Sequence, residues 1–97
     1  MLENLTKEDW LSYLGDVFVL SAEPDKSLEL TLMDVSGFGR RHGAVREAYS
    51  LHFRGPITPV LQQSIFGVSH REMGELEIFL VPIGKDADGV QYEAIFT

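Results

Sequence analysis

The segment KDADG, residues 85–89, holds two carboxylates two positions apart, as calcium-binding loops do. If Gly89 takes the glycine position of an EF-hand loop, the first ligand position falls on Gly84 and the bidentate glutamate position falls on Ile95. Neither residue has a carboxylate. The pair Asp88-Gly89 is also a common hairpin signal, because glycine accepts a positive φ. The segment therefore predicts a turn, and we expect no metal and no other cofactor.

Positive charge gathers around the glycine-rich segment GFGRRHG, residues 37–43. Here Arg40, Arg41 and Arg46 supply three of the eight Lys/Arg of the chain, and His42 lies between them. The G-x-G-x-x-x-G spacing matches neither the dinucleotide-binding fingerprint nor the Walker A loop. The arginines are either solvated on a surface loop or in contact with an acidic partner surface, for which arginine is well suited. Arg40, Arg41, His42 and Arg46 are therefore the candidate partner contacts.

The three histidines, His42, His52 and His70, lack the close pairing that histidine metal sites use. The sequence also has no G-x-S-x-G motif, which would position a nucleophilic serine. Ser50 shares a strand face with His52, but side chains two positions apart on a strand are too distant for a reliable hydrogen bond. We expect no catalytic residue, and structural or surface roles for the histidines.

The elements that carry these residues begin with one short helix. Thr6 followed by Asp9 predicts an N-cap with an acidic capping box, and Gly15 is placed to end the helix in a left-handed conformation. Three apolar residues are expected on one face: Trp10, Leu11 and Leu14. A helix of about eight residues is not stable alone in water, so Trp10 is expected to anchor it on the rest of the fold.

After the helix, apolar residues recur at every second position, which predicts strands. The expected strands cover residues 17–22, 27–35, 45–55, 64–70, 76–83 and 90–96. Their short connections favour antiparallel hairpins. Residues 78–83 are apolar on both faces, which is typical of a central strand in a barrel, of a strand covered by the helix, or of an oligomer interface. We expect a mainly β fold of about six antiparallel strands, as a small barrel or strongly curled sheet with one short N-terminal helix.

Composition limits the classes of function. The length is typical of one domain, expected over residues 1–97. The net charge of −7 disfavours nucleic-acid binding, which needs a basic surface. The chain has no apolar run long enough to span a membrane, no pattern of a signal peptide and no cysteine, so we expect a cytoplasmic protein that binds neither nucleic acid nor membrane.

Three segments together resemble a known family: MLENLTKEDWLSYLGDVF at the start, LHFRGP in the centre, and GELEIFLVPIG with GVQYEAIF at the end. The resemblance is to small uncharacterised bacterial proteins that form a domain of unknown function, and it extends over nearly the whole chain. It implies a compact single domain and supplies no catalytic residues. It also implies that relatives occur near genes for phage-tail-collar-like proteins, which favours an assembly or accessory role.

The sequence leaves two hypotheses for the function. The first is a non-enzymatic protein-interaction or assembly-accessory module, whose partner is another protein or a further copy of the chain. The alternative is a small-ligand-binding β-barrel or a minor hydrolytic enzyme that uses His52 or His70. A concave pocket with convergent polar groups favours the alternative, whereas a filled barrel with flat apolar and charged surfaces favours the first.

Overall fold

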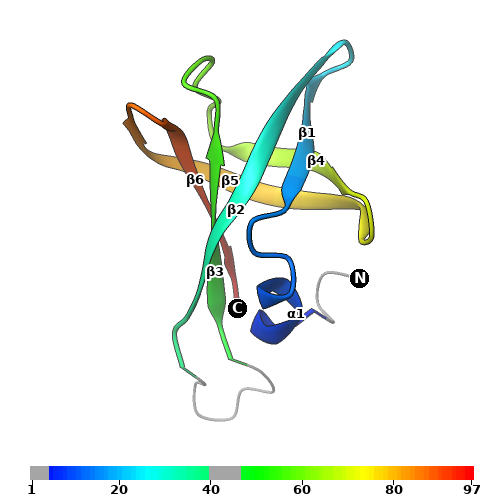
Figure 1. Ribbon diagram of the computed structural model, residues 1–97, viewed down its shortest axis with the longest axis vertical. Coiled ribbons are helices and arrows are strands. Elements are labelled where there is room, and N and C mark those ends of the chain that lie inside the picture. The colour runs from blue at the N-terminus through cyan, green and yellow to red at the C-terminus, as the bar shows by residue number, and fades with distance from the viewer. Residues whose placement is uncertain (1–4, 40–46) are drawn as a thin grey trace.

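The computed structural model describes residues 5–39 and 47–97 of the 97-residue chain. In these residues one short helix precedes six antiparallel strands that form a closed barrel (Figure 1). The bounds in chain order are α1 Lys7–Leu11, β1 Val17–Glu23, β2 Lys26–Gly37, β3 Tyr49–Gly55, β4 Ser64–His70, β5 Gly74–Asp86 and β6 Gly89–Phe96. The order around the barrel is β1-β2-β3-β6-β5-β4, and β1 pairs with β4 to close it. The expected fold class is confirmed.

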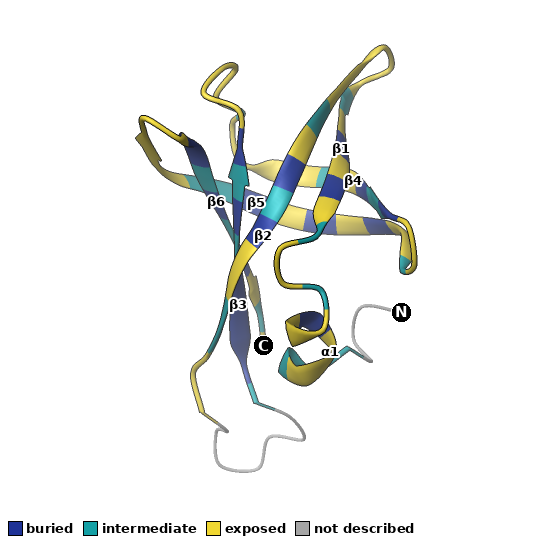
Figure 2. Cartoon of the chain, in the orientation of Figure 1, coloured by how far each residue is buried: buried dark blue, intermediate teal, exposed yellow. Residues whose placement is uncertain are grey.

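Buried and exposed residues alternate along the strands (Figure 2), and the buried side chains fill the interior of the barrel. On β3, for example, Tyr49, Leu51 and Phe53 are at most 1% exposed. The largest fully buried side chains come from the helix and from every strand: Trp10, Tyr49, Tyr92, Phe18, Phe53, Leu20, Leu30, Leu32, Leu51, Ile78, Leu80 and Val68. Barrels of about eight strands are just filled by side chains, so a six-stranded barrel holds its own core and little else.

The helix docks as expected. The Thr6 hydroxyl accepts from the Asp9 backbone N–H, and the Asp9 carboxylate accepts from the Thr6 backbone N–H at 2.8 Å, which completes the capping box. Trp10 is fully buried and lies against Phe96, with ring centroids 6.1 Å apart. Its indole Nε1 donates to the Tyr49 hydroxyl at 2.9 Å. The indole therefore anchors the helix by apolar contact and by a buried hydrogen bond.

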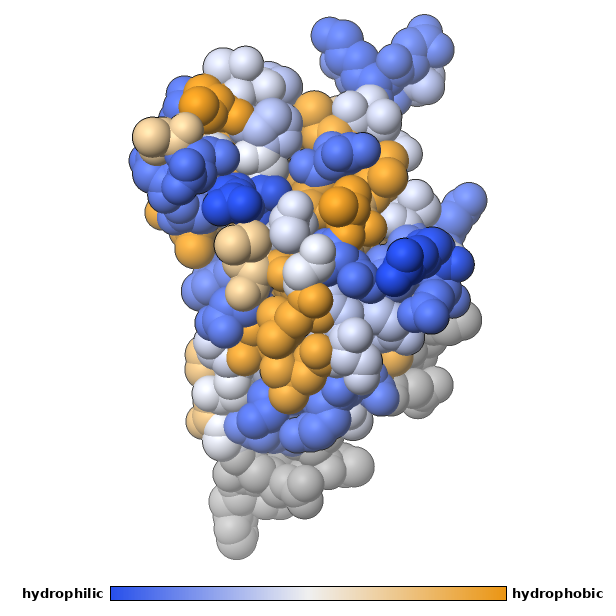
Figure 3. Space-filling model, viewed as in Figure 1, coloured by the Kyte–Doolittle hydropathy of each residue, from blue (hydrophilic) through white to orange (hydrophobic). Residues whose placement is uncertain are grey.

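The prediction that Trp10, Leu11 and Leu14 share one face of the helix is wrong. Trp10 is buried, but Leu11 and Leu14 are 41% and 44% exposed. Leu11 is rotated about 100° from Trp10 around the helix axis, and Leu14 lies after the end of α1, in the turn that Gly15 closes with a φ of +85°. Figure 3 shows hydrophobic side chains gathered on the visible face in the region of α1.

The predicted hairpin of β5 and β6 is confirmed. Ala87 and Asp88 form its turn, and Gly89 is paired with Asp86. Gly89 has a φ of +149°, so the expectation of a positive φ there is correct. The strand bounds agree less well with the prediction than the pairing does. For example, β3 begins at Tyr49, four residues later than expected.

Candidate functional site

The outer face of β4, β5 and β6 carries apolar side chains where a solvent-facing strand normally carries polar ones. Ile65 on β4 lies directly opposite Phe79 on β5, and these residues are 64% and 50% exposed. On β6, Ile95 lies two residues beyond Glu93, the partner of Val81, and is 57% exposed. We call Ile65, Phe79 and Ile95 the apolar row. It covers three neighbouring strands.

Residues 78–83 are apolar on both faces of the strand, and the two faces have different surroundings. Ile78 and Leu80 are buried inside the closed barrel. Phe79 and Ile83 face outward and are about half exposed, at 50% and 49%. The helix does not account for them, because its one buried side chain, Trp10, lies against side chains of β1, β3 and β6. Of the three explanations that the sequence offers, barrel closure accounts for the inner face, and the prediction of an interface at the outer face stays a prediction.

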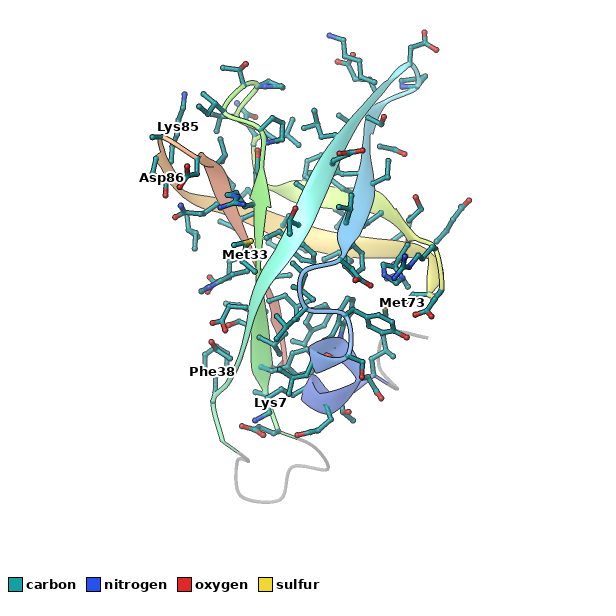
Figure 4. All side chains as sticks on the ribbon, viewed as in Figure 1. Lys7, Met33, Phe38, Met73, Lys85 and Asp86 are labelled. Carbon is teal, nitrogen blue, oxygen red and sulfur yellow. The ribbon has the colours of Figure 1, made fainter. Side chains whose placement is uncertain are left out.

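Carboxylates border the apolar row. Glu75 and Glu77 lie on the outer face of β5 and are exposed, and Glu77 is paired in register with Gly67. Glu93, on β6, lies on the other side of the row. Lys85 is the one Lys or Arg of these three strands. It lies at the far end of β5, next to Asp86 and away from α1 (Figure 4). The row therefore has an acidic border.

A hollow lies beside this face, where two β-bulges turn apolar side chains outward. The β2–β3 ladder shifts register at Met33, and the β5–β6 ladder shifts at Ile83. These residues, 46% and 49% exposed, line a hollow of about 280 Å³ together with His52, Arg54 and Gln91. Figure 4 shows Met33 at the surface of β2. The hollow is lined by both apolar and polar side chains, a combination that suits one side chain or a small molecule.

The polar groups around this hollow are already engaged with one another. His52 Nε2 lies 3.2 Å from Glu93 Oε2. Asp86 accepts a hydrogen bond from the Asp88 backbone N–H at 2.8 Å and another from the Gln91 side chain. The hydrogen bond from the Asp88 backbone, assisted by that from Gln91, lowers the pKa of Asp86 below its ordinary value of 3.8. Asp86 therefore stabilises its own turn, which agrees with an architectural role for residues 85–89.

His70 is the second histidine that the sequence singled out, and its ring is fully enclosed. The side chain is 0% exposed, and Nε2 lies 2.8 Å from Asp16 Oδ2. Nδ1 accepts from the backbone N–H groups of Glu72 and Met73, at 3.1 and 3.3 Å. Nε2–H must therefore donate to Asp16, and neither ring nitrogen has a lone pair left for a substrate. His70 holds the β4–β5 turn to the start of β1.

The predicted partner contacts Arg40, Arg41, His42 and Arg46 lie outside the described residues, so their role stays a prediction. The chain on either side of them is held by Glu47. Its carboxylate accepts from the Gly39 backbone N–H at 3.1 Å and pairs with Lys7 Nζ at 3.3 Å. The ends of the basic segment are thus fixed next to the helix. Within residues 5–39 and 47–97, no group of three or more metal-ligating side chains is assembled.

The apolar row was only partly visible in the sequence. The two-sided apolar run 78–83, which contains Phe79, indicates an interface in the sequence, whereas no local pattern marks Ile65 or Ile95. Their place beside Phe79 depends on the pairing of β5 with β4 and β6. The signal in the sequence is an apolar residue at an outward position of each of three strands, and it becomes readable only once the register is known.

The chain matches the family described as Domain of unknown function (DUF6916) over residues 5–96. No curated protein and no solved structure matches it. Among the residues that the structure describes, no helix has the length and hydropathy needed to cross a bilayer.

Proposed function

We propose that this chain, which belongs to the family described as Domain of unknown function (DUF6916), is a non-enzymatic protein-interaction module. It serves as an accessory part of a larger protein assembly, in the bacterial cytoplasm or in a phage-tail-like structure. The observation that carries the proposal is the apolar row of Ile65, Phe79 and Ile95, which lies exposed across three strands of a closed barrel.

Isolated apolar residues on a surface need no explanation, whereas contiguous ones mark interaction sites. Within the apolar row, Ile65 and Phe79 are contiguous because they are cross-strand partners, and Ile95 lies on the neighbouring strand β6. It stands on strands whose inner faces are packed with side chains such as Leu76, Ile78 and Val68. A rigid scaffold keeps the row in place before binding, so little ordering entropy is lost when a partner docks.

The state of His70 supports a non-enzymatic role. A general base needs a lone pair within reach of a substrate proton. Both nitrogens of His70 are occupied by Asp16 and by two backbone N–H groups. His52 is more accessible and pairs with Glu93 through Nε2, so it is the histidine to which the alternative hydrolytic role would fall.

Small-ligand binding remains the second candidate because of the hollow between Met33 and Ile83. Its volume, about 280 Å³, lies at the lower limit of ligand pockets, which hold about 300–1,000 Å³. It lies outside the barrel, at the bulges of two ladders. This position suits a partner side chain as well as a free ligand, so the hollow fits within the interaction proposal.

The test is affinity capture from the native host with mass spectrometry. The bait is compared with Ile65→Ser/Phe79→Ser and with Val60→Ser, a matched control at an exposed apolar residue of the β3–β4 connection. We expect a partner that is retained by the control and lost by the double variant, while both variants melt at the temperature of the parent. If no protein is enriched over an unrelated bait in any sample, the proposed function is wrong.

A further inference from the structure

We propose that the outer face of β4, β5 and β6 binds a polypeptide segment of another protein in which apolar side chains are flanked by lysine or arginine. The inference rests on the proposed function and names the chemistry of the partner. The apolar row supplies the contact surface, and the carboxylates at its border select the charge of the partner.

The apolar part of the argument begins with Ile65 and Phe79, which face solvent as direct cross-strand partners. Side chains of such a pair are about 5 Å apart, so together they present one surface. Val81, on the same face of β5, continues it towards Ile83. Covering these half-exposed side chains removes apolar surface from water, which makes the row the main source of affinity.

The electrostatic part of the argument comes from Glu75 and Glu77. Both are exposed on the outer face of β5, and neither forms an ion pair with another residue that the structure describes. A partner that covers Phe79 must come close to Glu77, two residues away. A neutral or acidic partner would desolvate this carboxylate without compensation, whereas a lysine or arginine would pair with it. Rim pairs of this kind contribute little affinity but select the partner and its orientation.

Gly67 provides an independent observation. It lies at an exposed position of β4, where it is paired with Glu77 inside the β4–β5 ladder and with Ser21 at the last pair of the β1–β4 ladder. Its φ is not positive, and a Cβ at this position would meet nothing within 4 Å. Glycine inside a strand is unfavourable relative to residues with a side chain, and no steric contact or backbone conformation requires it at this position. It leaves a notch beside the apolar row, where the backbone of a partner can approach closely.

A second copy of the chain fits this face less well. Each copy carries a net charge of −7, and the outer faces of β4–β6 would bring the same carboxylates together with Lys85 as their one Lys or Arg. Association of two copies would grow stronger with added salt, whereas binding of a basic segment would grow weaker. Salt dependence therefore separates the two occupants.

The probe is a random 12-residue peptide library displayed on phage and selected on the intact chain. Enriched peptides are synthesised, and their binding is measured by fluorescence polarisation. We expect them to combine apolar residues with lysine or arginine. The affinity should fall at least tenfold in Phe79→Ser and in Gly67→Val, and several-fold in Glu75→Gln/Glu77→Gln, with a shallower dependence on salt in the last variant. The affinity for Val60→Ser should stay unchanged.

Each contrary outcome has a separate meaning. Enriched peptides that bind Phe79→Ser as well as the parent would overturn the inference and leave the proposed function standing, because a different surface would be the binding site. Enrichment of peptides without basic residues would overturn the charge assignment, and failure to enrich any peptide would overturn the inference as a whole. A dimer in light scattering that Phe79→Ser dissociates would assign the face to a second copy. Circular dichroism melts of every variant confirm folding.

Discussion

At the scale of single residues, the close approach of β3 and β6 requires a glycine at position 89. A Cβ built on Gly89 would lie 2.1 Å from the carbonyl oxygen of Gly55, the residue opposite the next position of β6. Its φ of +149° is also one that L side chains rarely adopt. Steric crowding and backbone conformation therefore both require glycine. The sequence pattern Asp88-Gly89 indicated only the positive φ and not the crowding.

We predict that Gly89→Val lowers the free energy of unfolding by about 1–3 kcal/mol, because the backbone must leave a conformation that only glycine holds without strain. The matched control is Gly67→Ala, since a Cβ at Gly67 meets nothing within 4 Å. Urea unfolding of both variants measures the difference. Equal stability of Gly89→Val and the parent would mean that the hairpin end adopts another conformation in solution.

At the scale of elements, the helix depends on one side chain. α1 spans only Lys7–Leu11, too short to be stable alone, and Trp10 is its one buried residue. The indole lies over Phe18 and Phe96, with ring centroids 6.1 Å from each, and donates to Tyr49. The Tyr49 hydroxyl in turn donates to the Leu5 carbonyl at 3.2 Å, so β3 holds the chain on both sides of the cap.

We predict that Trp10→Ala lowers the free energy of unfolding by about 3–5 kcal/mol, through the cavity that it leaves and the loss of the hydrogen bond to Tyr49. Leu14→Ala, at a residue that is 44% exposed, is the control and should change stability by less than about 0.5 kcal/mol. The parent protein should show blue-shifted tryptophan emission that is resistant to quenching. A red-shifted, readily quenched emission would place the indole in water.

The elements also separate what the sequence can predict from what it cannot. Alternation predicted six strands, and the Thr6–Asp9 pattern predicted the cap, because both are local signals. The bulges at Met33 and Ile83 could not be predicted, since a bulge is defined by the opposite strand and leaves the alternation readable on either side. The hollow between them was therefore not foreseen.

The candidate site follows the same division. The outward side of Phe79 was visible in the two-sided apolar run of residues 78–83, whereas its neighbours Ile65 and Ile95 come from other strands. Their assembly depends on register across segments 14 and 16 residues away along the chain, and no local pattern encodes that register. For His70, the missing information was its contact with Asp16, 54 residues earlier.

At the scale of the whole molecule, closure of the barrel removes the exposed edges that an open sheet would have. The seams of the barrel, by which we mean the ladders that join neighbouring strands, differ in length. β1 and β4 are joined at three positions, Val19↔Ser69, Leu20↔Val68 and Ser21↔Gly67, whereas β3 and β6 are joined at seven. The β1–β4 seam also contains Gly67, which contributes no side-chain contact there. The β1–β4 seam is therefore expected to be the less stable of the two.

We predict that the barrel opens first between β1 and β4. Native-state hydrogen exchange should give the amides that donate across this seam a lower free energy of opening than those between β3 and β6, since local openings occur where the fewest interactions are lost. A disulfide formed by Val19→Cys with Ser69→Cys, which are directly paired, is the control. It should raise the free energy of opening at the seam, and its reduction should restore the original value. Equal opening free energies in all strands would instead mean that the barrel unfolds as one cooperative unit, in which closure contributes as much as any hairpin.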